Sequence, residues 1–220
     1  MNMIRILMAV IMSTFLLLDA SIAAAMDWSA GPGLKPVTEN HTYQTMERRQ
    51  GESTIRVPFY QGKNERLGTA LNDRMEKEVD DYLKFLNNDK RPYRVTGWLY
   101  WQEGETEPYA SVVLLESIMY EGAAHPLTYV KGVTFDENGK RITLADLKAA
   151  MPDLTLERLR QETKRQCDER NINMFAENTI DDFPKEFYIG NDGNLYFIFQ
   201  QYDIAPYVAG WIMINMGRMK

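Results

Sequence analysis

Residues 120–147 of the chain read YEGAAHPLTYVKGVTFDENGKRITLADL. A turn of small residues presents His125, a strand is predicted from Thr128 to Phe135, and residues 136–139 form a second turn. Thr143 and Asp146 have the spacing of a capping box, in which each side chain binds the backbone N–H of the other residue at a helix start. Turn, strand, turn and helix in this order predict a domain of mixed α and β structure.

Two main helices are predicted outside this stretch. Between Glu65 and Leu86 apolar residues recur at helical spacing, which is typical of a helix with one buried face. A second helix is predicted from Leu154 to Arg170 on the same ground.

Strand patterns precede and follow these helices. Residues 53–60 alternate, residues 93–102 and 109–120 predict a long hairpin around the acidic loop 103–108, and residues 186–189 and 195–202 flank a turn at 191–194. A first strand is expected near residues 41–46 and a last one at residues 208–216. We therefore predict an α+β fold, with antiparallel β-sheets packed against two main α-helices.

The first strand of the long hairpin carries aromatic residues on both faces. Trp98 and Tyr100 share one face, and Leu99 and Trp101 share the other. One pair is expected to pack on the first helix. The other pair could form an exposed platform for carbohydrate, although core packing is the favoured interpretation.

The N-terminus predicts export. Residues 1–25 combine Arg5, a short apolar run and Ala23-Ala24-Ala25, which is typical of a signal peptide; an uncleaved anchor is the alternative. No membrane span is expected after cleavage, and the protein should be periplasmic or extracellular. Residues 26–51 contain structure-breaking Gly and Pro residues and are expected to form an exposed arm.

The charge of the chain limits the classes of partner that it is expected to bind. The net charge of −6 argues against binding to nucleic acid or an anionic membrane, and it suits a basic partner. The single cysteine, Cys167, cannot form an internal disulfide and is expected to be a small buried residue.

The sequence contains no recognisable catalytic motif. The chain has two histidines, His41 and His125, and their spacing does not suit a zinc site, so we expect no metal, no cofactor and no catalytic residue. His41 lies in a polar setting and is expected to be solvated. For His125 two interpretations stay open: a ligand-contacting or pH-responsive group, or a turn histidine that binds backbone and fixes its loop.

Several motifs together resemble a known extracellular module. They are YEGAAHP at residues 120–126, VTFD at 133–136, ITLADL at 142–147, NLYF at 194–197 and QYDIAPY at 201–207. This order resembles the outer domain of RsiV-type anti-sigma factors, which also occurs in PdaC-type peptidoglycan deacetylases. On this resemblance residues 52–120 correspond to a PdaC-type N-terminal module and residues 121–220 to an RsiV-type C-terminal module, and the two are expected to share one core.

The resemblance implies an α+β domain outside the cytoplasmic membrane. In RsiV-type proteins the module binds lysozyme. Only five residues precede the apolar segment here and no deacetylase domain follows, so we expect the exported module alone. Ala123 stands where the family motif usually has a second glycine.

We therefore predict an exported, non-catalytic cell-envelope module that recognises a protein such as lysozyme, or another basic protein, or a peptidoglycan glycan. The alternative is a cell-wall-active hydrolase or deacetylase, or its accessory, with an unrecognised site. The candidate binding residues lie in loops that present tyrosine, histidine and acidic groups: Tyr120, Glu121, His125, Tyr202, Asp203 and Tyr207.

Overall fold

A computed structural model describes residues 42–88, 95–106, 108–175 and 180–219. The predicted signal peptide, the start of the predicted arm and His41 lie outside these ranges. No helix within them is long and apolar enough to cross a membrane. The described chain has an α+β fold with two sheets, as the sequence predicts.

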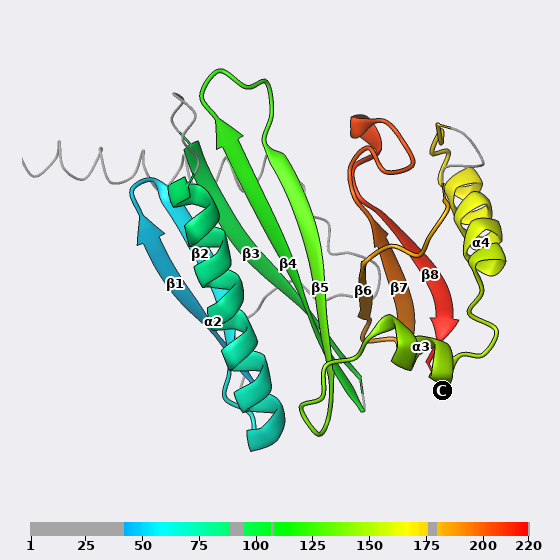
Figure 1. Cartoon of the computed structure of the whole chain (residues 1–220), viewed down its shortest axis with the longest axis horizontal. Coiled ribbons are helices and arrows are strands. Elements are labelled where there is room, and N and C mark those ends of the chain that lie inside the picture. Colours follow the sequence, from blue (N-terminus) through cyan, green and yellow to red (C-terminus); the bar gives the residue numbers. More distant parts are fainter. Residues whose placement is uncertain (1–41, 89–94, 107, 176–179, 220) are drawn as a thin grey trace, which may run out of the picture. The chain divides into compact units, whose positions relative to one another are not determined.

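The first sheet has five strands in sequence order (Figure 1): β1 (Tyr43–Gln50), β2 (Ser53–Tyr60), β3 (Val95–Thr106), β4 (Tyr109–Tyr120) and β5 (Leu127–Asp136). Neighbouring strands are antiparallel except β2 and β3, which pair over a short register. These two strands are parallel because the helix α2 (Glu65–Asn88) connects them and returns the chain to the same end of the sheet. The first sheet is therefore mixed, with three antiparallel pairs and one parallel pair, where the sequence predicts an antiparallel sheet.

Three predicted segments differ in detail. The segment expected as an exposed arm forms β1 from Tyr43 onward, and Tyr43 itself is buried in the core. The acidic loop 103–108 is shorter than expected, because Glu103 to Thr106 continue the ladder opposite β4. The last strand starts later than expected, since a 3-10 turn, η1 (Tyr207–Ala209), precedes β8 (Ile212–Arg218).

Helix α2 covers one face of the five-stranded sheet and encloses its core (Figure 1). Leu71 and Met75 on the helix are fully buried, and Leu99 and Trp101 are the pair of β3 that packs in this core. Trp98 and Tyr100 on the opposite face are half-buried. The core-packing interpretation of one pair is therefore confirmed.

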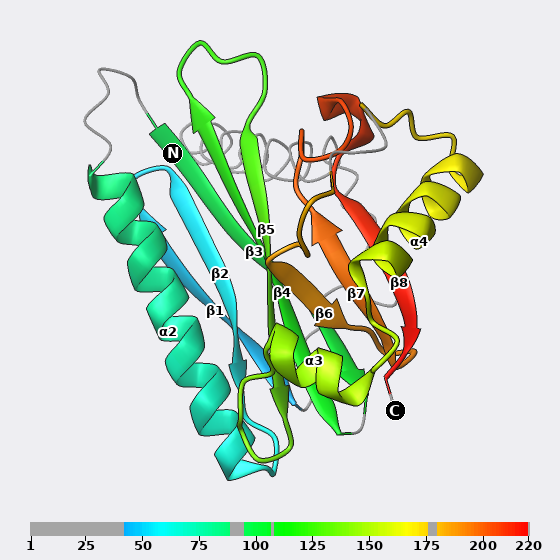
Figure 2. The ribbon, with the colours of Figure 1, turned by 45° about the vertical axis from the view of Figure 1, so that its right-hand side comes forward.

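The second sheet contains β6 (Glu186–Ile189), β7 (Asn194–Phe199) and β8, with β7 in the centre. Leu195 to Phe199 are all buried, which confirms that this strand is covered on both faces. Helices α3 (Leu144–Ala150) and α4 (Leu156–Glu169) cover one face (Figure 2), and Leu147, Leu159 and the free Cys167 are buried there. The capping box of Thr143 and Asp146 starts α3 as predicted.

The two sheets contact each other where β6 crosses β5 at Gly132. A Cβ atom at Gly132 would lie 1.8 Å from the carbonyl oxygen of Phe187, so only glycine permits this crossing. The hydroxyl of Ser111 on β4 accepts a hydrogen bond from Ile189 N at 2.9 Å beside it. Since the neighbouring side chains of β4 and β5 point to α2, the second sheet lies against the face that α2 leaves uncovered.

Candidate functional site

The predicted binding residues lie in two connections: residues 120–126 between β4 and β5, and residues 200–211 between β7 and β8. Their meeting point is the ring of His125, which stacks on the ring of Tyr207 with centroids 3.9 Å apart and planes 24° apart. Tyr202 lies beside Tyr207, with ring centroids 5.8 Å apart. We call His125, Tyr202 and Tyr207 the aromatic corner.

One backbone carbonyl holds both stacked rings. Pro126 O lies 3.1 Å from Nδ1 of His125 and accepts a hydrogen bond from the hydroxyl of Tyr207 at 3.3 Å. The proline restricts the backbone of His125 to an extended conformation, which keeps its ring at the end of the loop. His125 therefore binds backbone, as one of its two interpretations predicts, and it also takes part in the aromatic corner.

A glutamine fixes the second connection to the first sheet. The carboxamide of Gln200 accepts a hydrogen bond from Val130 N at 2.9 Å and donates one to Val130 O at 2.8 Å. Val130 lies on the free edge of β5, so Gln200 replaces one pair of a missing neighbouring strand. This anchor holds the aromatic corner on a rigid sheet.

Tyr202 and Asp203 form the tight turn after Gln200. Tyr202 has a φ of 70°, a backbone conformation that residues other than glycine and asparagine rarely adopt. The residue is 56% exposed. One carboxylate oxygen of Asp203 accepts a hydrogen bond from Gln200 N at 2.7 Å. The turn thus holds an exposed tyrosine in a strained conformation, which is a feature often found at functional sites.

Two further predicted residues, Tyr120 and Glu121, lie where the first connection begins. Tyr120 is the last residue of β4 and is half-buried, and Glu121 is exposed in the turn that follows. Ala123 N donates to Tyr120 O at 3.0 Å, and Gly122 has a φ of 80°, so this turn is well defined. Both residues share the connection of His125.

The structure adds residues that the sequence did not single out. Leu127 and Tyr129 at the start of β5 are exposed large apolar residues, and Val208 in η1 is 93% exposed. The hydroxyl of Tyr129 donates to Glu186 at 3.3 Å. Partial burial together with the charge of Glu186 raises the pKa of Tyr129 to about 12. The sequence around Leu127, Tyr129 and Val208 does not indicate that these side chains are exposed. Which parts of the first sheet are covered depends on the second sheet, whose residues are distant in the chain.

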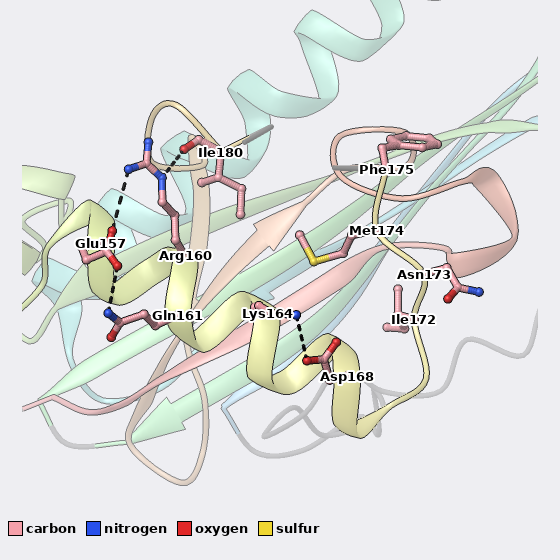
Figure 3. A pocket seen from close by; sticks show the side chains of 10 residues that line it. All are labelled: Glu157, Arg160, Gln161, Lys164, Asp168, Ile172, Asn173, Met174, Phe175 and Ile180. Atoms are coloured by element: carbon pink, nitrogen blue, oxygen red, sulfur yellow. Dashed lines mark hydrogen bonds and ion pairs between the residues drawn. The ribbon is translucent and has the colours of Figure 1, made fainter. Parts of the chain in front are cut away.

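A separate cavity of about 550 Å³ lies along α4 (Figure 3). Its polar side chains bind one another: Lys164 pairs with Asp168 at 3.2 Å, Gln161 donates to Glu157 at 2.9 Å, and Arg160 donates to the carbonyl of Ile180 at 2.9 Å. None of the candidate binding residues lines it. The described residues contain no group of three or more His, Cys, Asp or Glu side chains placed to hold a metal ion.

Comparisons with known proteins concern the fold. Residues 140–217, which span α3, α4 and the three-stranded sheet, match the family described as "Protein of unknown function (DUF3298)". A member of this family from Bacteroides fragilis has a crystal structure similar to this chain, with a TM-score of 0.52, 18% identity and coverage of 84% of this chain and 90% of that chain. No curated protein matches the chain. Residues 140–217 are therefore similar to the DUF3298 family, and the chain shares the fold of that structure.

Proposed function

We propose that this chain is an exported, non-catalytic module of the cell envelope that binds a basic protein through the aromatic corner. The observation that carries the proposal is the convergence of His125, Tyr202 and Tyr207 from two connections onto one surface. Pro126 O holds the rings of His125 and Tyr207, and Gln200 anchors the connection that carries Tyr202 and Tyr207, so little conformational entropy is lost when a partner binds.

The exposed side chains around the corner are of the kind that protein interfaces use. Tyrosine is enriched at such interfaces, because a large apolar ring carries a polar tip. Tyr202, Leu127 and Val208 are each more than half exposed, and all three lie in or directly beside the two connections.

The charge of the chain supports a basic partner. The net charge is −6, and Glu121, Glu186 and Asp203 lie on or beside the two connections. The sequence resemblance to RsiV-type modules makes lysozyme the first partner to test. A peptidoglycan glycan is the competing ligand, because its sugar rings could stack on exposed tyrosines.

Binding of lysozyme to the purified chain tests the proposal. We expect binding that survives high salt, since the Debye length falls to about 3 Å at 1 M and removes simple charge attraction. Tyr202→Ala and Tyr207→Ala should each weaken it by about tenfold or more, which is typical of central interface tyrosines. Phe85→Ala is the matched control, because Phe85 is an exposed aromatic on α2 outside the corner.

Other outcomes would redirect the assignment. Equal losses in all three variants, or binding that disappears with salt, would contradict the corner as the interface. Retention of the chain on purified peptidoglycan, lost in Tyr202→Ala, would favour the glycan. Release of soluble muropeptides by the chain would contradict a non-catalytic role.

A further inference from the structure

We infer that Nε2 of His125 is a hydrogen-bond acceptor in the binding surface, which selects an N–H or O–H donor of the partner and releases it when the histidine is protonated. This inference rests on the proposed function, because it assigns a specific contact and its regulation to the same surface. It follows from how the aromatic corner holds the imidazole ring.

The bonding of the ring determines its tautomer. Nδ1 of His125 lies 3.1 Å from Pro126 O, and a carbonyl oxygen can only accept a hydrogen bond. Nδ1 must therefore carry the proton. In the neutral imidazole the other nitrogen, Nε2, then has a free lone pair.

Nε2 is left available to a partner. The described residues provide a stacking ring for His125 and a carbonyl for Nδ1, and within these ranges no hydrogen bond to Nε2 occurs. The stack on Tyr207 and the bond from Nδ1 to Pro126 O together hold the ring in this orientation, and His125 is half-buried. The acceptor is thus preorganised.

Protonation would reverse the chemistry of this atom. An imidazolium has donors at both nitrogens, so Nε2 can no longer accept a hydrogen bond, and its positive charge also repels a basic partner. Both effects weaken binding when the imidazole is protonated. The titratable groups on the segments that meet here are Tyr120, Glu121, Tyr202, Asp203 and Tyr207, with Tyr129 and Glu186 beside them.

The first test needs no partner. Long-range ¹H–¹⁵N NMR spectra of the full chain at pH 8, with His41→Gln to assign the signals, should show a protonated Nδ1 and an unprotonated Nε2 for His125. A dominant Nε2–H tautomer would overturn the inference, whatever the chain binds.

The second test uses lysozyme as the probe. His125→Phe keeps a flat ring on Tyr207 and removes the acceptor, so it should weaken binding at pH 8 by about three- to tenfold, the contribution of one hydrogen bond. Binding by the wild-type chain should weaken further toward pH 5 relative to His125→Phe, which serves as the reference for protons bound by lysozyme itself.

The possible failures are distinguishable. If wild type and His125→Phe show the same affinity or the same pH dependence, the contact is wrong and the proposed interface can still stand. If Tyr202→Ala also leaves binding unchanged, the interface itself is wrong. If lysozyme binds at no pH, both the proposed partner and this contact are rejected.

Discussion

Gln200 forms both hydrogen bonds that a neighbouring strand would offer to Val130: its Oε1 accepts from Val130 N at 2.9 Å, and its Nε2 donates to Val130 O at 2.8 Å. The edge of β5 is covered in the same way at Gly132, whose N–H donates to Glu186 at 2.9 Å, and at Thr134, whose carbonyl accepts from Ile142 N at 2.9 Å. Side chains and a short bridge therefore complete an edge that would otherwise attract a foreign strand.

Replacing this anchor should loosen the site. We expect Gln200→Ala to lower the free energy of unfolding by about 2 kcal/mol, because two partly buried backbone groups lose their partners. Urea denaturation measures the change. Gln161→Ala is the control, since the Gln161 amide donates to Glu157 on the exposed face of α4, and this substitution should cost less than about 0.5 kcal/mol. Equal costs would contradict the anchoring role.

Tyr202 allows binding and folding to be separated. Glycine adopts a φ of 70° without strain, and this gain of about 1 kcal/mol offsets the greater entropy of glycine in the unfolded chain. We therefore expect Tyr202→Gly to change the free energy of unfolding by less than about 1 kcal/mol while it weakens lysozyme binding by about tenfold or more. A large loss of stability would show instead that the Tyr202 ring supports the fold through Tyr207.

A buried carboxylate joins α2 to the five-stranded sheet. The side chain of Glu78 is 3% exposed, receives hydrogen bonds from Arg74 and, at 3.2 Å, from Lys131, and Lys131 also binds Glu116 at 2.7 Å. Glu78→Ala should lower the free energy of unfolding by about 3 kcal/mol, because it removes the buried carboxylate that the partly buried Arg74 and Lys131 share. Asp81→Ala, which breaks an exposed pair with Lys77, should have little effect in the same denaturation experiment. Similar losses would contradict this assignment.

The close crossing of the two sheets should not tolerate a side chain. In Gly132→Ala the new methyl group would meet the backbone of Phe187, which cannot rotate away, and we expect a loss of about 3 kcal/mol or more. Gly51→Ala is the control, because Gly51 has a φ of 60° and no atom near its Cβ position, so only local strain of about 1 kcal/mol applies. Thermal unfolding distinguishes the two. A small loss of stability in Gly132→Ala would mean that the two sheets can move apart to admit the methyl group.

The start of α3 should respond to acid. Hydrogen bonds from Lys140 and from Thr143 lower the pKa of Asp146 to about 2. Because the folded-state pKa lies below the usual value, the carboxylate stabilises the fold above about pH 4 and this stabilisation is lost as the pH falls toward 2. An NMR titration of the Asp146 carboxyl carbon should have its midpoint near 2, and a midpoint near 4 would contradict the capping geometry.

Local sequence signals determined most elements of this protein. The apolar spacing of α2, the capping box at Thr143, the turn at Gly193 and the unbroken apolar strand β7 each depend on neighbours within a few residues, so a linear pattern records them. The same holds for His125, since a lone histidine before a proline in a small-residue turn stands out in the sequence.

Only the tertiary structure showed the contacts between residues that lie far apart in the chain. The parallel pairing of β2 with β3, the crossing of the sheets at Gly132, the bond from Gln200 to Val130 and the stack of His125 on Tyr207 join residues distant in the chain. Such contacts leave no periodic trace, because either partner alone fits an ordinary strand or turn. The sequence could name the candidate residues, and only the fold shows that three of them form one surface.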